Sequence, residues 1–232
     1  MPADRGAGLR PVVFVDVEAS SLFADSFPVE VGYARPRALP WGGCAIELAS
    51  ASVRPEPAWL SSGGWNPGAE AIHGLSREAL LRHGLPAGDV CDLLDGAFGG
   101  RAVVADTGGG SVDDLWLAVL YDAAGREPVD WRVDERTSDQ VIHDACRGHG
   151  LRPEIVLPPL LFRAPRPTHA AAEDALCDAW LYAMVEQLGR FRLGERDASG
   201  QRAAMRDVAR AVPPECWPRV DATGRGFRRR GG

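Results

Sequence analysis

The chain has 232 residues, of which 45% are hydrophobic and 25% are charged, and its formal net charge is −6. These values are ordinary for a globular domain, and no run approaches the ~18 apolar residues that a membrane-spanning helix needs. The first ten residues also lack the apolar core of a signal peptide. We therefore expect a cytoplasmic protein that makes no use of a membrane.

Positive charge gathers near the C-terminus. All basic residues are arginine, and residues 190–232 hold 11 Arg against 5 acids, a net of +6, whereas residues 1–189 carry 15 − 27 = −12. The Arg-rich segment could bind phosphate or could be a solvated terminus. We expect an N-terminal extension over 1–10, a folded domain over 11–189, and a partly disordered Arg-rich extension over 190–232.

The first quarter of the folded domain predicts strands. Residues 11–15 form an apolar run typical of a buried strand, and residues 27–36 alternate, with Glu30 and Gly32 on the same face. Residues 44–55 predict a third strand. The three runs follow one another closely, which favours an antiparallel meander.

The middle of the chain predicts mainly helices. Residues 55–68 are rich in Pro, Gly, Ser and Trp and predict a loop. Helices are expected over 75–84 and 87–98, followed by a short buried strand over 102–105. Apolar residues at helical spacing predict a further helix over 112–123.

The last third combines one more strand with helices. We expect a strand over 128–133, a polar helix over 137–148, a proline-rich irregular segment over 151–167, and a long apolar helix over 168–188. A short helix is possible within 201–211. This order of elements predicts an α/β layered domain with a mixed sheet.

Two carboxylates interrupt the end of the first strand. Asp16 and Glu18 lie two residues apart, so their side chains leave the same face of the strand. Holding two carboxylates together is costly unless a cation compensates them, and oxygen ligands suit Mg²⁺ or Mn²⁺. The alternative is an exposed strand end with incidental acids, and these two residues alone leave both interpretations open.

Acids also stand at two helix starts. Asp113 lies in the first turn of the helix over 112–123, where an acid next to it, Asp114, is explained by the helix dipole alone. His169 and Asp174 open the long last helix, and a carboxylate on a largely apolar helix needs a partner. A histidine near a helix start is more often structural than catalytic.

Three segments together resemble the DEDDh 3′–5′ exonucleases, a family that includes the proofreading subunit of bacterial DNA polymerase III, ribonuclease T and oligoribonuclease. The segments are "FVDVEASSL", "VDDLWL" and "HAAAEDA", and they occur in the order of the family's three motifs. "VEVGYA" and "IHGLS" resemble further family segments. The resemblance covers roughly residues 11–188, and it implies a ribonuclease H-like three-layer domain with a five-stranded mixed sheet flanked by helices.

The second motif departs from the family pattern. The segment "ADTGGGSV" replaces a His-Asn pair that often precedes the second-motif Asp, so Asp106 and Asp114 are rivals of Asp113 for this position. We prefer Asp113 because Trp116 then falls on one of the apolar positions that follow. The Thr and Gly usual after the first-motif Glu are Ala19 and Ser21 here.

The resemblance implies hydrolysis of single-stranded DNA or RNA from the 3′ end with release of nucleoside monophosphates. It assigns two divalent cations, Mg²⁺ or Mn²⁺, to Asp16, Glu18, Asp113 and Asp174, with His169 as the base. It also implies that Leu22 and Phe23 stack on the terminal base, although ordinary packing would explain Leu22 equally well. The full set of substrate-binding residues that we expect is Ala19, Ser20, Leu22, Phe23, His73 and Trp116.

Two other functions stay open. The chain could be a catalytically weak nucleic-acid-binding module of the same fold, or an accessory module associated with a polymerase. A second copy of the chain as partner is also compatible with the sequence, which does not decide between DNA and RNA.

Overall fold

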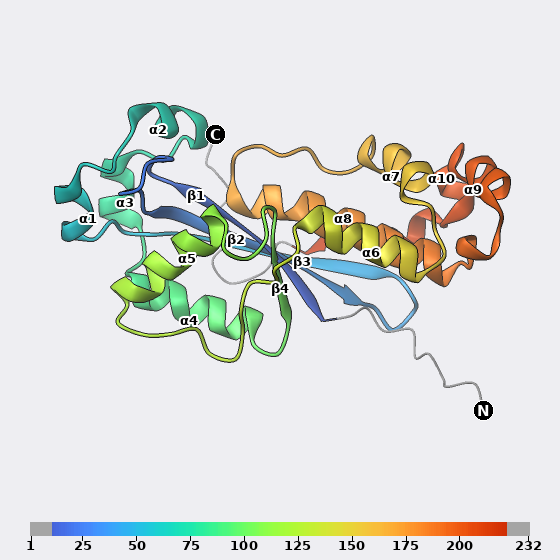
Figure 1. Ribbon diagram of the computed structural model, residues 1–232, viewed down its shortest axis with the longest axis horizontal. Coiled ribbons are helices and arrows are strands. Elements are labelled where there is room, and N and C mark those ends of the chain that lie inside the picture. The colour runs from blue at the N-terminus through green and yellow to red at the C-terminus, as the bar shows by residue number, and fades with distance from the viewer. Residues whose placement is uncertain (1–10, 222–232) are drawn as a thin grey trace.

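A computed structural model describes residues 11–221, which fold around a mixed five-stranded sheet (Figure 1). The strands are β1 (Val12–Ala19), β2 (Pro28–Ala38), β3 (Cys44–Ser52), β4 (Ala102–Ala105) and β5 (Arg219–Asp221), in the spatial order β4-β1-β2-β3-β5. The meander β1–β2–β3 is antiparallel, whereas β4 pairs parallel to β1 and β5 pairs parallel to β3. The predicted meander is therefore confirmed.

Helices occupy most of the remaining chain. They are α1 (Pro57–Ser62), α2 (Pro67–His73), α3 (Arg77–His83), α4 (Ala87–Phe98), α5 (Val112–Ala123), α6 (Ser138–Gly148), α7 (Pro153–Leu161), α8 (Ala171–Arg190), α9 (Ala198–Met205) and α10 (Val208–Ala211). Within residues 11–221, no helix combines the length and apolar character that crossing a bilayer requires.

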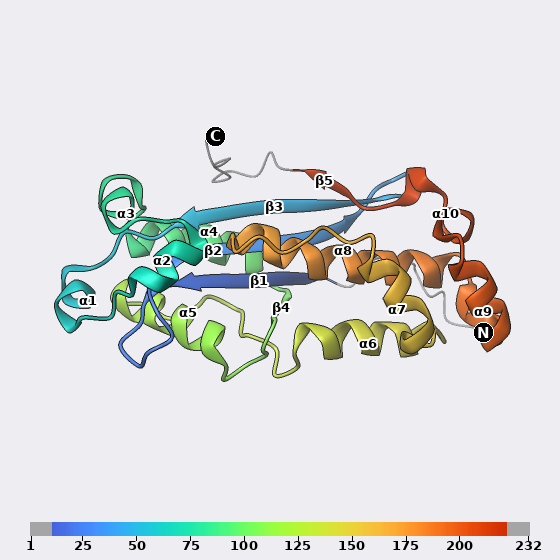
Figure 2. The ribbon, with the colours of Figure 1, turned by 90° about the horizontal axis from the view of Figure 1, so that it is seen from above.

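The alternation of β1 divides the core into two layers. Val12 and Phe14 pack with the apolar residues of α8, whereas Val13 and Val15 pack on the opposite face with α4 and α5. Figure 2 shows α8 running along β1, β2 and β3. The expected α/β fold, with helices on both faces of a five-stranded mixed sheet, is confirmed.

A third, smaller cluster closes one end of the sheet. Phe27 stacks on Trp59 with ring centroids 5.2 Å apart, and Leu80 completes the cluster from α3. The segment 55–68, predicted as a loop, contains α1 and the start of α2. Proline occupies the first turn of both helices, where its missing N–H costs nothing, and asparagine caps the second.

The strand predicted over 128–133 is wrong. Only Val133 forms an isolated bridge, to Val103, because Trp131 inserts its ring against Phe98 and Tyr121 instead of extending a ladder. The fifth strand is β5, from the distant C-terminal part of the chain. The irregular segment predicted over 151–167 is wrong in its first half, where α7 begins with a proline at its N-terminus.

The packed core continues beyond residue 190, the predicted start of the Arg-rich extension. Met205, Val208 and Val212 lie in the same cluster as the apolar face of α8, and Trp217 packs edge-to-face on Trp180 at 6.3 Å. The extension predicted over 1–10 and the final residues predicted as disordered lie outside the described part of the chain.

Close contact between β2 and α8 depends on Gly32. A Cβ atom at this position would lie 2.0 Å from the backbone nitrogen of Ala172, so α8 could not keep its place. We expect Gly32→Ala to lower the free energy of unfolding by about 1–3 kcal/mol, the usual cost of overpacking, in urea titrations. Gly96→Ala is the control, because open space surrounds Gly96 in α4 and alanine should be neutral or stabilising. Equal stability of the two variants would contradict the close contact.

Candidate functional site

The end of β1 places two carboxylates on the face that α8 covers. Asp16 and Glu18 continue the alternation of Val12 and Phe14, whose side chains pack against α8. Both acids are partly buried. The expectation that they leave the same face of the strand agrees with this alternation.

The start of α8 brings His169 and Asp174 to Glu18. One ligand atom from each of these three residues lies within 4.8 Å of the other two. Asp174 is oriented because its Oδ1 accepts a hydrogen bond of 2.7 Å from the backbone N–H of Thr168. His169 is exposed, and its backbone is left-handed with φ +57°. A carboxylate pair with an imidazole is a donor set that suits a divalent cation.

Asp113 lies in the first turn of α5 and is only 5% exposed. Burial raises the pKa of Asp113 to about 6, the hydroxyl of Thr107 opposes this rise with a hydrogen bond of 3.2 Å, and the negative charge of Asp106 adds to it. Helix α5 packs on the opposite face of the sheet from α8. The site would therefore join residues from both layers.

Asp16 is at the centre of the negative charge. Its pKa is raised to about 9, chiefly by burial and then by repulsion from Asp113, Glu18, Asp174 and Asp106, in decreasing order. A carboxyl group in such surroundings either keeps a proton or requires a cation. The charges of the other three predicted metal ligands thus all act on Asp16.

The two rivals of Asp113 are placed differently. Asp114 Oδ2 accepts a hydrogen bond of 2.8 Å from the N–H of Gly110, so it closes the preceding loop. Asp106 is exposed, accepts a hydrogen bond of 2.9 Å from Ser138, and follows β4 directly beside β1. Of the three acids, Asp113 is the buried one and its charge acts most strongly on Asp16, whereas Asp106 has a smaller effect.

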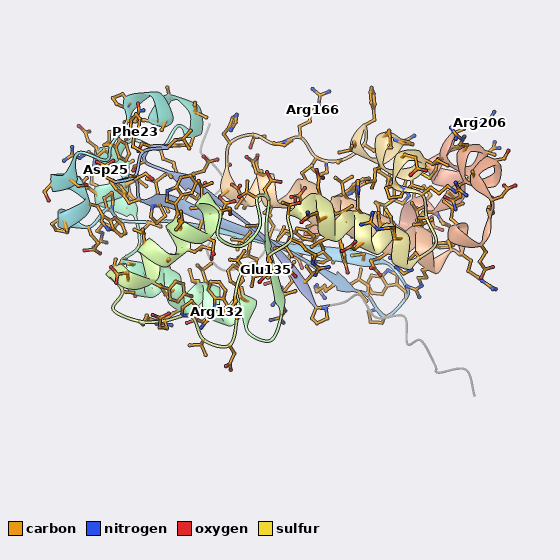
Figure 3. All side chains as sticks on the ribbon, viewed as in Figure 1. Phe23, Asp25, Arg132, Glu135, Arg166 and Arg206 are labelled. Atoms are coloured by element: carbon orange, nitrogen blue, oxygen red, sulfur yellow. The ribbon has the colours of Figure 1, made fainter. Side chains whose placement is uncertain are left out.

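The predicted substrate-binding residues divide into exposed and buried ones. Leu22 is 86% exposed and Phe23 is 66% exposed on the loop after β1, and Figure 3 shows Phe23 there together with Asp25. Trp116 is buried, and its Nε1 donates a hydrogen bond of 2.7 Å to Ser26 of the same loop. Leu22 and Phe23 therefore have the exposure that contact with a ligand needs.

Three of these residues are placed inside the protein. Ser20 Oγ donates to the carbonyl of Gly64 at 2.7 Å and accepts from the N–H of Phe27 at 3.0 Å, so its hydroxyl holds the loop. His73 is buried at the end of α2, where its Nδ1 accepts a hydrogen bond from the N–H of Leu75. Ala19 is buried as well. The substrate contacts expected of these three residues therefore stay predictions.

Two buried or partly buried acids near the site were not expected from the sequence. Glu30 lies directly opposite Glu18 in the pairing of β1 with β2, and it contacts the start of α8. Asp178 lies one helical turn beyond Asp174, and burial raises its pKa to about 7. The sequence feature that could have identified Glu30 is its position in an alternating strand, on the face shared with Gly32, because a carboxylate that becomes buried there needs a partner.

The fold, a mixed five-stranded sheet flanked by helices, resembles that of solved exonuclease structures. A structure of exonuclease I aligns with a TM-score of 0.52 at 15% identity over 85% of this chain and 44% of that chain. A zinc-bound complex of E. coli exonuclease I with single-stranded DNA aligns with a TM-score of 0.50 at 17% identity, over 72% and 38% of the two chains.

A complex of the E. coli enzyme with a dA16 oligonucleotide aligns equally well, with a TM-score of 0.50 at 17% identity over 84% of this chain and 43% of the other. The chain thus spans less than half the length of these exonuclease I chains. No protein-family model matches the sequence, and no curated protein does. At such identities the likeness establishes the fold.

Proposed function

We propose that the protein is a metal-dependent 3′–5′ exonuclease that releases nucleoside monophosphates from the 3′ ends of single-stranded DNA or RNA. The observation that carries this proposal is the convergence of carboxylates from β1, α5 and α8 on Asp16, beside His169. The likeness to exonuclease I, whose structures hold single-stranded DNA, supports the same conclusion.

Asp16, Glu18, Asp113 and Asp174 would hold the divalent cations, Mg²⁺ or Mn²⁺. Their fit rests on Asp16, whose ionised form is disfavoured by burial and by the neighbouring carboxylates and would be stabilised by positive charge. When bound, such ions polarise the scissile phosphate and lower the pKa of a water molecule. They would also offset the acidic charge of the cleft, which otherwise repels a nucleic acid.

The remaining steps belong to side chains of this protein. His169 would accept the proton of the attacking water, because it is exposed and lies within reach of the acids. Leu22 and Phe23 would stack on the terminal base, a contact that tolerates any base. Thr107 would keep Asp113 oriented through its hydrogen bond.

Digestion of matched single-stranded DNA and RNA, labelled at the 3′ or the 5′ end, tests the function. With Mg²⁺ or Mn²⁺, we expect the 3′ label to appear at once as a mononucleotide and the 5′-labelled strand to shorten stepwise. Undiminished digestion in EDTA would contradict the metal mechanism, and cleavage at internal positions of the strand would contradict an exonuclease. A binding module without turnover would retain the strand and leave it intact.

Asp113→Asn should lower kcat about a hundredfold or more, because it removes a charge of the proposed metal site but keeps the acceptor for Thr107. Asp114→Asn is the matched control, since its carboxylate serves the loop. Single-turnover rates at saturating Mn²⁺ compare the two variants. If Asp113→Asn stays active and either Asp114→Asn or Asp106→Asn loses most of the cleavage rate, the inactive variant identifies the metal ligand of the second motif.

A further inference from the structure

The start of helix α8 is held by a residue from another element. Its N-cap residue, Ala170, has no side chain that could cap the helix, yet the N–H of Ala171 donates a hydrogen bond of 3.2 Å to Glu30 Oε2 on β2. A carboxylate at this end of a helix is favoured by the helix dipole and satisfies an N–H group that the helix itself leaves without an acceptor.

Glu30 is fixed from both sides. It is 9% exposed, and its second oxygen, Oε1, accepts a hydrogen bond of 3.0 Å from the hydroxyl of Ser50 on β3. Both carboxylate oxygens are thus engaged by donors, and a buried carboxylate is tolerated only when its oxygens are satisfied in this way. Glu30 therefore links β3, β2 and the first residue of α8.

The position of Glu30 relates it to the proposed metal site. It stands directly opposite Glu18 in the β1–β2 register, and Ala171 precedes Asp174 by less than one helical turn. Glu18 and Asp174 come from different elements, so the distance between them depends on where α8 begins above the sheet. Gly32 sets the distance between α8 and the sheet, because backbone atoms of the first turn of α8 occupy the position that a Cβ atom of residue 32 would take.

We propose that Glu30 is a positioning residue that holds Asp174 at the distance from Glu18 that a divalent cation requires, and keeps His169 beside them. This inference rests on the proposed function of the site. Glu30 acts through the backbone of α8 and does not bind the cation, since its two oxygens are already engaged. Partners in this position typically alter metal affinity about 10–100-fold when they are removed.

The test compares Glu30→Ala, Glu30→Gln and Ser50→Ala in the full chain. Mn²⁺ affinity is measured by electron paramagnetic resonance, and kcat and KM are measured on single-stranded DNA. We expect Glu30→Ala to weaken Mn²⁺ binding about 10–100-fold and to lower kcat more than it alters KM. Glu30→Gln keeps an acceptor but loses the charge at the helix end, so a loss of about two- to fivefold is expected, and Ser50→Ala should act in the same direction.

Glu47→Gln is the control, because Glu47 pairs with Arg35 on the face of the sheet away from α8 and should leave Mn²⁺ affinity unchanged. Wild-type Mn²⁺ affinity and kcat in Glu30→Ala, with only a lower melting temperature, would overturn the proposal. If Glu30→Ala does not fold, wild-type affinity in both Glu30→Gln and Ser50→Ala would overturn it. If the wild-type protein binds Mn²⁺ but does not cut DNA, the exonuclease function is refuted and Mn²⁺ affinity still tests the role of Glu30. If the wild-type protein binds no Mn²⁺, both the exonuclease function and the role of Glu30 are refuted.

Discussion

Asp16→Asn is expected to lower kcat about a thousandfold and to raise the melting temperature of the metal-free protein. The loss follows from removing a central ligand, because metal stabilisation of transition-state charge is worth several kcal/mol. The gain in stability follows from burial, which together with four neighbouring carboxylates disfavours an ionised Asp16. Asparagine has a similar shape and never ionises, so it avoids this cost.

The raised pKa of Asp16 also predicts how the stability of the metal-free protein changes with pH. The pKa of Asp16 rises from 3.8 to about 9 in the folded protein, so the folded state binds a proton more tightly than the unfolded state. The resulting stabilisation is fully present below the unfolded pKa and is lost as pH rises toward 9. Asp113 and Asp178, whose pKa values are also raised, act in the same direction at lower pH.

Urea unfolding in EDTA between about pH 5 and about pH 9 measures this effect. Wild-type stability should fall across the range, and the fall should be smaller in Asp16→Asn. Asp122→Asn, an exposed acid on α5, should keep the wild-type slope and turnover. Retained cleavage by Asp16→Asn in a clean preparation, or an unchanged slope, would show that Asp16 lacks the proposed surroundings.

The elements that build the site could be predicted from the sequence because their signals are local. The alternation of β1 is enough to place Asp16 and Glu18 on one face, and the helical spacing after Ser111 marks the start of α5. Fold class followed from the order of such segments. Local sequence patterns do not predict a strand whose partner is distant in the chain. Strand β5 is an example, because its three exposed or partly exposed residues show no strand pattern and pair with β3 from the far end of the chain.

Side-chain partners were harder to predict than elements. "PVDWRV" has the composition of a strand, but Trp131 is buried between aromatic rings and its Nε1 donates to Asp95 at 2.8 Å. Ser20 looks like a residue that could bind a substrate, yet its hydroxyl is engaged by the backbone of Gly64 and Phe27. The position of Glu30 in an alternating strand indicated that its carboxylate would need a partner. The sequence could not identify that partner, because the N–H of Ala171 lies 141 residues further along the chain.

His169→Asn is expected to lower kcat about 10²–10⁴-fold, the usual contribution of a general base. Asparagine suits this position because the backbone of His169 is left-handed, a conformation that asparagine tolerates better than most residues do. The fold and the melting temperature should therefore be preserved. Single-turnover cleavage of 3′-labelled DNA measures the loss, and His83→Asn, an exposed histidine on α3, is the control.

The same variant separates two roles for the imidazole, because its nitrogen lies close enough to Glu18 and Asp174 to be a metal ligand itself. A base that does not bind the cation leaves Mn²⁺ affinity unchanged when it is removed, and added imidazole should restore part of the lost rate. A ligand loses affinity together with rate, and a higher Mn²⁺ concentration restores cleavage. We expect the first result because four carboxylates already surround Asp16 and supply the charge that cations require. Weakened Mn²⁺ binding in His169→Asn would make His169 a ligand and leave the proton of the attacking water to another group.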